Sequence, residues 1–220
     1  MTAFFALFAV VALAPLFIGS WRSVLGSLGL QALLLAGRVL VESPELDGQA
    51  QLLVLELVLL RGIFAPAYLA WCVQRSPHAV KIDPIPANLV HWIVAFGFLV
   101  AAGTFAARTG AKDVHEGAHV AAVASLFLLG FLVVLSHGAP VGQMIGVLVV
   151  ENGALLAEEL LETRWPIPVQ LGLALAFAGT VLVFGRFLRI LQTTVMLPSS
   201  ISGGDSSDNL GPPVEEVEVL

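Results

Sequence analysis

The chain has 220 residues, of which 58% are hydrophobic and 12% charged, and its formal net charge is −6. A soluble domain carries about 25% charged residues, so this composition indicates an integral membrane protein. The ten Lys and Arg residues are scattered and form no basic patch, which excludes nucleic-acid binding. The single cysteine, Cys72, excludes an internal disulfide and an iron–sulfur cluster, because such a cluster needs about four thiolates.

Seven apolar runs follow one another along the chain. Each approaches the roughly 20 residues that a helix needs to cross the hydrocarbon core of a bilayer, and none alternates like a membrane β-strand. The first run lacks the basic start and the cleavage site of a signal peptide, so we expect it to be a spanning helix. The sequence therefore predicts an all-α polytopic membrane protein. The runs are Thr2–Gly19, Val24–Val41, Gln51–Val73, Asn88–Ala107, Ala118–Ser136, Val141–Leu161 and Ile167–Leu191.

Basic residues near the helix ends predict the orientation, because cytoplasmic loops carry an excess of Lys and Arg. Arg22, the pair Arg75 and Lys81, and the pair Arg186 and Arg189 all fall on one side if the helices alternate. We therefore expect the N-terminus outside and the C-terminus in the cytoplasm.

A faint internal repeat suggests how the chain is organised. Sliding Leu25–Gln31 onto Ile145–Glu151 keeps the apolar pattern, and parallel repeats recur in membrane proteins. Chance alignment of apolar sequence explains the match equally well. The repeat would make two three-helix units joined by a central helix, followed by a Ser-, Gly- and acid-rich tail that should be disordered. The corresponding units are residues 1–86, 87–116, 117–197 and 198–220.

The run Val141–Leu161 carries a Glu-Asn-Gly tripeptide at mid-depth, and its glutamate is Glu151. An acid within a spanning helix is costly and usually functional, so Glu151 is the strongest candidate for a proton-transfer group. The alternative is a glutamate that only locks helix packing. Asn152 lies beside it, and Gly146 and Gly153 would let another helix approach closely.

Three further charged residues are candidates for the same path. Glu158 lies seven residues after Glu151, so both point along one helix face. In the third run, Glu56 and Arg61 are five residues apart, which in an α-helix leaves them about 140° out of alignment. Their long side chains could still meet, but partners on another helix or subunit are the favoured interpretation. We expect Pro66 to kink that helix or free a carbonyl.

The remaining acids and histidines favour structural interpretations. Glu159 and Glu162 lie near the membrane surface, where they can be hydrated. A histidine can relay protons near neutral pH, but single histidines at helix ends are more often plain hydrogen-bonding residues, and no metal-ligand spacing is present. The histidines concerned are His91, His115, His119 and His137.

The motif VENGALLAEELL, followed by a loop and a final helix ending GRFLRILQ, resembles the hydrogenase-4 component E family, a membrane subunit of formate-hydrogenlyase-type and other energy-converting hydrogenases. The match is clearest over residues 127–192, and Arg61 stands where the family tends to carry a basic residue. The last three helices, within 117–197, are similar in turn to the K (4L-type) subunit of complex I and to the C subunit of cation/proton antiporters. One departure is that Ile167–Leu191 lacks the second acid of the complex I subunit.

This resemblance implies a non-catalytic subunit in the plasma membrane of a bacterium, with Glu151 on a proton or sodium path. It implies antiporter-like subunits and hydrogenase large and small subunits as partners. The nickel–iron and iron–sulfur centres would lie on those partners, since we expect no cofactor or metal in this chain. Glu56 or Glu158 would replace the missing acid. The alternatives are a self-contained transporter or channel, and a purely structural scaffold.

Overall fold

The computed structural model describes residues 2–17, 20–43, 47–75, 89–111, 113–158 and 165–195, and all regular elements in these ranges are helical. The predicted all-α fold is confirmed, whereas the tail 198–220 and the acids Glu159 and Glu162 lie outside the described residues. The helices are α1 (Thr2–Phe17), α2 (Trp21–Glu42), α3 (Gly48–Leu55), the π-helix η1 (Glu56–Phe64), α4 (Ala65–Gln74), α6 (Leu89–Arg108), α7 (Val114–Ser136), α8 (Pro140–Glu158) and α9 (Ile167–Val195).

Within the described ranges, six helical spans are long and apolar enough to cross a membrane, with α3, η1 and α4 running on as one span. The first predicted span is shorter than expected, because α1 covers 16 residues and contains Pro15. The protein is therefore a multi-pass membrane protein of six or seven spanning helices.

Side-chain caps explain where several helices begin. An N-cap oxygen accepts a hydrogen bond from one of the first backbone N–H groups, which have no partner within the helix. Asp47 accepts from Ala50 N at 2.8 Å before α3, and Asp113 accepts from Glu116 N at 2.7 Å before α7. These polar breaks fix the ends of the apolar runs.

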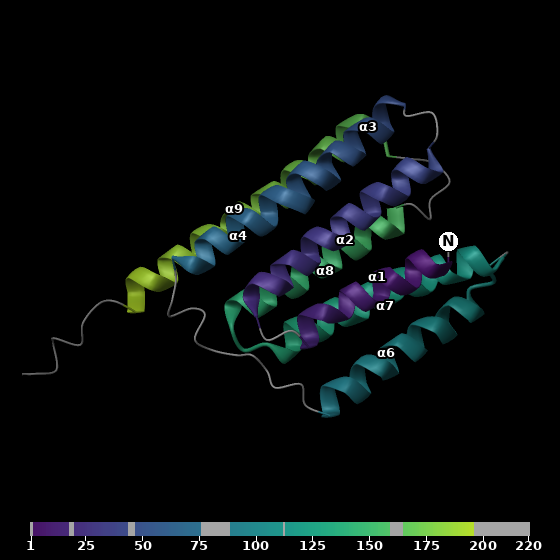
Figure 1. The fold of residues 1–220 in the computed structure, drawn as a ribbon, viewed down its shortest axis with the longest axis horizontal. Helices are drawn as coiled ribbons and strands as arrows, with labels where there is room; N and C mark the ends of the chain where they lie inside the picture. The colour runs from purple at the N-terminus through teal and green to yellow at the C-terminus, as the bar shows by residue number, and fades with distance from the viewer. Residues whose placement is uncertain are drawn as a thin grey trace, which may run out of the picture.

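The helices form two layers that lie face to face (Figure 1). One layer holds α1, α2 and the continuous rod of α3, η1 and α4, and the other holds α7, α8 and α9. The main contacts between the layers join α1 to α7, α2 to α8, and α4 to α9. The helix α6 flanks this arrangement and packs against α7. The paired helices are those that the suggested repeat would relate, although the repeat itself stays a prediction.

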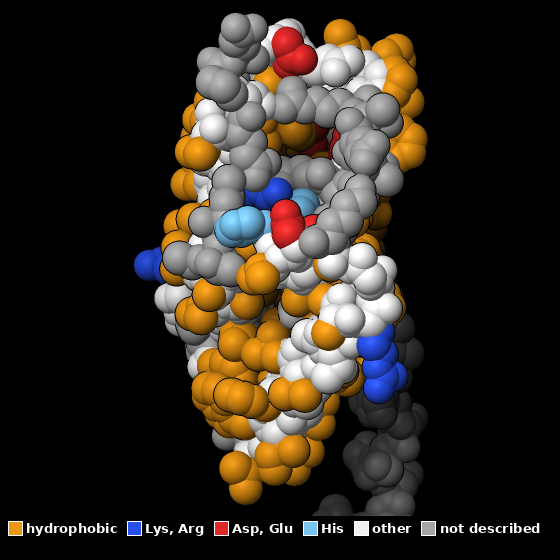
Figure 2. Space-filling model, turned by 90° about the vertical axis from the view of Figure 1, so that its right-hand side faces the viewer, with side chains coloured by type: hydrophobic (Ala, Val, Ile, Leu, Met, Phe, Trp, Pro, Cys, Tyr) orange, Lys and Arg blue, Asp and Glu red, His pale blue; other side chains and the backbone are white. Residues whose placement is uncertain are grey.

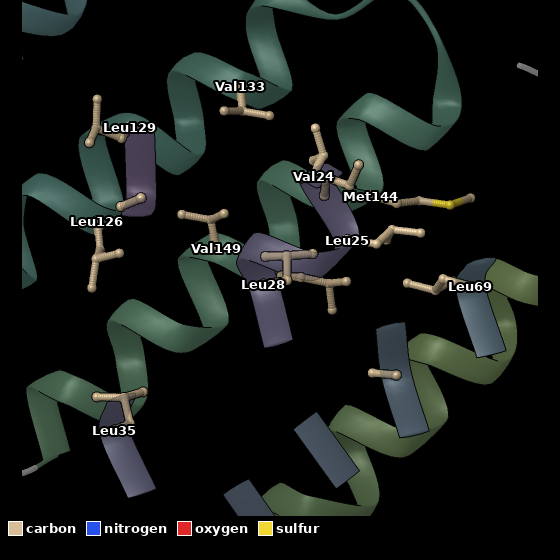
Figure 3. Close-up of a cluster of buried hydrophobic side chains, with 14 of the residues drawn as sticks. Val24, Leu25, Leu28, Leu35, Leu69, Leu126, Leu129, Val133, Met144 and Val149 are labelled. Atoms are coloured by element: carbon tan, nitrogen blue, oxygen red, sulfur yellow. The ribbon is translucent and has the colours of Figure 1, made fainter. Parts of the chain in front are cut away.

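The apolar core follows α8, which packs against α7 on one side and α2 on the other. Figure 3 shows Leu28 of α2 near Val149 of α8, with Leu129 on α7, Leu35 further along α2 and Leu69 on α4. All five side chains are buried. By contrast, the outward faces of α6 and α9 expose large apolar side chains, as expected for helices in contact with lipid.

Glycines set the spacing between α7 and α8. A Cβ atom at Gly146 would lie 2.7 Å from the Gly130 carbonyl oxygen, and one at Gly153 would lie 2.9 Å from the Leu126 Cβ. No real side chain tolerates such contacts without moving a backbone. Gly146 and Gly153 therefore allow α7 and α8 to pack closely, as small residues do between membrane helices.

Candidate functional site

The charged candidates gather around one pocket between α8, α9 and η1. This pocket has a volume of about 530 Å³, and its walls are mostly apolar. Arg61 reaches it from η1, Glu151 and Glu158 line it from α8, and Phe177 lines it from α9. Three of the four predicted path residues thus share a single pocket, and the fourth, Glu56, contacts Arg61.

Arg61 is the buried centre of this group. Its side chain is only 5% exposed and Glu56 is 7% exposed, and Arg61 Nε donates to Glu56 Oε1 at 3.1 Å. The guanidinium carbon also lies 3.9 Å from the centroid of the Phe177 ring, which is cation–π geometry. A guanidinium withdrawn from water is stabilised here by one carboxylate and one aromatic face.

Partners on other helices were the favoured prediction for Glu56 and Arg61, but the structure shows the less favoured alternative, a pair between the two residues. The π-helix is the reason. A π-helix closes its hydrogen bonds from residue i to i+5, so Glu56 and Arg61 come to lie one above the other instead of 140° apart. The bond from Ala65 N to Leu60 O shows this i to i+5 pattern at the end of η1. The widened turns stop just before Pro66, whose ring would collide with the Gly62 carbonyl in an α-helix.

Pro66 has a second effect on packing. It has no N–H to donate to Gly62 O, and this carbonyl faces α2. A Cβ atom at Gly29 would lie 2.8 Å from Gly62 O and 3.3 Å from Pro66 Cγ. Glycine at position 29 therefore allows α2 to pack directly on the charged segment of η1.

Glu151 and Glu158 face the same pocket, as their spacing of seven residues predicts. Glu151 is half-buried, and its Oε2 atom has no hydrogen-bond partner among the described residues. Arg61 Nη1 is likewise buried without a partner in that part of the chain. The Thr180 hydroxyl on α9 lies beside the Glu151 carboxyl. The pocket therefore combines apolar walls with unsatisfied polar atoms, a combination that suits bound water or a polar ligand group.

Asn152 does not line this pocket. It borders a small adjoining cavity with Arg61 and Phe177 and joins a chain of amides across the bundle. Its Nδ2 donates to Gln31 Oε1 at 3.1 Å, and Gln31 Nε2 donates to Val11 O at 3.4 Å. The Val11 carbonyl needs this donor because Pro15, four residues later, has no N–H. Asn152 therefore links α8 to α2 and α1 and leaves the proton chemistry to Glu151.

Two of the histidines hold helix ends. His119 is buried, and its Nε2 lies 2.8 Å from Leu156 O in the last turn of α8, where carbonyls lack partners within the helix. His137 Nδ1 donates to Val133 O at 2.9 Å at the end of α7. Neither lines the pocket of Arg61 and Glu151. These contacts favour the structural interpretation of both residues.

Comparison with known proteins adds no family to this picture. No protein-family model, no curated protein and no solved structure matches the chain. The resemblance to hydrogenase-4 component E stays a prediction from the sequence. Among the described residues, no group of His, Cys, Asp and Glu is arranged to hold a metal ion.

Sequence reasoning missed three residues that shape the site. Phe177 and Thr180 lie on α9, which carries no acid, and the signal for Thr180 is a hydroxyl residue deep within an apolar span. Gln31 was aligned with Glu151 in the suggested repeat but was not singled out. The signal for Gln31 is Pro15, because a proline inside a spanning helix frees a carbonyl that a buried polar side chain must satisfy.

Proposed function

We propose that this chain is a non-catalytic membrane subunit of a hydrogenase-like, complex I-related assembly, and that it contributes a proton path. The observation that carries the proposal is the meeting of Glu56, Arg61, Glu151 and Glu158 around one pocket between three spanning helices. Buried carboxyl groups beside a fixed positive charge are suited to taking up and releasing protons. The resemblance of the Glu-Asn-Gly helix supplies the type of assembly.

The geometry indicates how a proton would pass along the path. Glu151 and Glu158 are separated by seven residues of α8, which is about 10.5 Å of rise. This distance is too long for a direct hydrogen bond, so transfer requires water in the pocket that both residues line. Figure 2, which views the end of the bundle where α8 ends, shows acidic side chains among the described residues at that end. Water would have to enter the pocket from this side for the path to reach the aqueous phase.

The position of Glu56 bears on which residue could replace the acid that α9 lacks. The ion pair of Glu56 and Arg61 lies against α9, because the guanidinium covers the Phe177 ring. A carboxylate on η1 thus stands close to the helix from which the complex I relative supplies its second acid. This placement supports Glu56 as the substitute, with Arg61 as the charge that responds to protonation of its neighbours.

The proposal places the metal centres and the remaining membrane subunits on partner proteins. Partner subunits would carry the nickel–iron and iron–sulfur centres, and antiporter-like subunits would pack beside this chain in a bacterial plasma membrane. The proton is the first candidate for the transported cation, and sodium is the second. The proposed orientation places the C-terminus in the cytoplasm.

Partner identification tests the assembly. The full chain, carrying an affinity tag, is purified from its native membranes in a mild detergent and its companions are identified by mass spectrometry. We expect antiporter-like and hydrogenase subunits to copurify, encoded by neighbouring genes. A chain that purifies alone and moves protons in liposomes would instead be a self-contained transporter, which the pocket within this single chain makes the second candidate.

Chemical labelling tests the path. A hydrophobic carbodiimide reacts with carboxyl groups that are protonated in apolar surroundings. We expect Glu151 or Glu158 to be labelled in native membranes, with Glu116, at the start of α7 outside the pocket, as the unlabelled control. Absence of label from both pocket acids would contradict a proton-exchanging site.

A further inference from the structure

A second charged feature lies at the other end of the molecule, where α4 and α9 end side by side (Figure 1). Arg75 is the residue that follows α4, and Arg189 lies in the last turns of α9. Both are exposed. The two spans end at Gln74 and Leu191, so both guanidiniums stand where a spanning helix leaves the hydrocarbon.

One tryptophan holds both cations. The Arg75 guanidinium carbon lies 4.2 Å from the centroid of the Trp71 ring, and that of Arg189 lies 4.6 Å from the same centroid. The two positive charges are therefore separated by no more than the sum of these distances. Cation–π contact offsets part of their repulsion and leaves both groups oriented around one point.

The tryptophan is itself fixed by packing. The Tyr68 ring stacks on Trp71 with a centroid separation of 6.1 Å. Gly185 of α9 makes room for Tyr68, because any Cβ atom at position 185 would collide with that ring. Aromatic side chains of this kind gather at the level of lipid headgroups. The packing of α4 against α9 therefore holds Trp71 in place, and Trp71 in turn orients both arginine side chains.

Within the described part of the chain, no carboxylate forms an ion pair with Arg75 or Arg189. The ion pair found there joins Arg61 to Glu56, away from these two arginines. Arg186, three residues before Arg189 on α9, adds a further exposed positive charge at the same end of the helix. Three guanidiniums at a membrane boundary produce a local positive field that needs an anion.

We propose that Arg75 and Arg189, held by Trp71, bind the phosphate of an anionic lipid headgroup. Arginine and phosphate form paired hydrogen bonds of about 2.7–2.9 Å, so one phosphate can be contacted from both sides by two guanidiniums spaced around a single ring. The apolar faces of α4 and α9 below the pair accept the acyl chains. The site lies apart from the proton path and goes beyond the proposed function.

Lipid titration of the full chain tests the proposal. Native mass spectrometry measures binding of short-chain phosphatidylglycerol and of phosphatidylcholine to detergent-purified protein. A basic residue at an anionic surface contributes about 1 kcal/mol, or roughly fivefold in affinity. We expect R75Q and R189Q each to weaken phosphatidylglycerol binding by about this factor and to leave phosphatidylcholine unchanged. The matched control is R22Q, because Arg22 is exposed at the start of α2 at the same end of the bundle.

A charge-preserving variant separates a built site from general attraction. W71L keeps every arginine but removes the ring that orients two of them, so it should weaken phosphatidylglycerol binding while R22Q does not. Equal binding of the two lipids, or equal losses in R22Q and R189Q, would overturn the proposal. Full displacement of the lipid by millimolar inorganic phosphate would assign the site to a soluble anion instead. A gain in lipid affinity after neutralising Glu215, Glu216 and Glu218 to Gln would assign it to the acidic tail of this chain.

Discussion

The ion pair between Glu56 and Arg61 makes a strong prediction about stability. The substitution Glu56→Leu leaves a guanidinium that is 5% exposed without its carboxylate. Its Nη1 atom already has no partner among the described residues. Removing one partner of a buried pair costs about 3–5 kcal/mol. Because Glu151 and the Phe177 ring remain beside Arg61, we expect a loss at the lower end, about 3 kcal/mol.

A second substitution should rescue the first. Arg61→Met removes the orphaned charge while it keeps most of the side-chain volume, and replacing both members of a buried pair by apolar residues is often neutral. We expect the free energy of unfolding of the double variant Glu56→Leu/Arg61→Met to lie within about 1 kcal/mol of that of the unmodified protein. The coupling between the two residues is the difference between the effect of Arg61→Met on stability in the Glu56→Leu background and its effect in the unmodified protein.

Unfolding of the full chain in mixed micelles, driven by sodium dodecyl sulfate and followed by circular dichroism, measures these free energies. The exposed Arg108 at the end of α6 provides the control, since Arg108→Met should change stability little. If the costs of Glu56→Leu and Arg61→Met simply add in the double variant, the two side chains do not interact, and the i to i+5 geometry of η1 is refuted.

Two other perturbations test the polar contacts outside the pocket. Gln31→Leu strands the Val11 carbonyl and the Asn152 amide, so it should lower the free energy of unfolding by about 1–2 kcal/mol in the same micelle assay, and an unchanged value would contradict the amide chain. At the start of α7, the hydrogen bond from the Glu116 backbone N–H lowers the pKa of Asp113. The charged cap therefore stabilises the fold above the unfolded pKa of about 4 and loses that effect as the pH falls through the lower folded value. Melting curves across this range should show a smaller acid-induced loss for Asp113→Asn, and identical curves would count against the cap.

The spanning helices were predictable from the sequence because hydrocarbon imposes long apolar segments on any chain that crosses it. The same rule made Glu151 visible, since a carboxylate interrupts such a segment. The pairing of Glu56 with Arg61 was not predictable from α-helical periodicity, because it depends on a change of helix type before Pro66. The neighbours of the pair, Phe177 and Thr180, are set by which faces of η1, α8 and α9 pack together.

The contacts between the two helix layers likewise include features that the sequence predicts and features that it does not. The repeat suggested that α2 and α8 are related, but periodicity alone does not say that they touch. Their contact includes the hydrogen bond from Asn152 Nδ2 to Gln31 Oε1, and Gln31 also satisfies the Val11 carbonyl that Pro15 frees on α1. Such features become visible only when the unsatisfied backbone groups of each helix are matched to donors on its neighbours.

Proton transfer by Glu151 is the central claim, and Glu151→Gln tests it directly. The amide keeps the size of the side chain but cannot release and rebind a proton. In the assembly purified through the tagged chain and reconstituted in liposomes, a pH-sensitive dye reports proton movement, with Glu116→Gln as the control. We predict that Glu151→Gln abolishes proton movement while the subunit composition stays the same. Proton movement at the unmodified rate in that intact assembly would contradict the account.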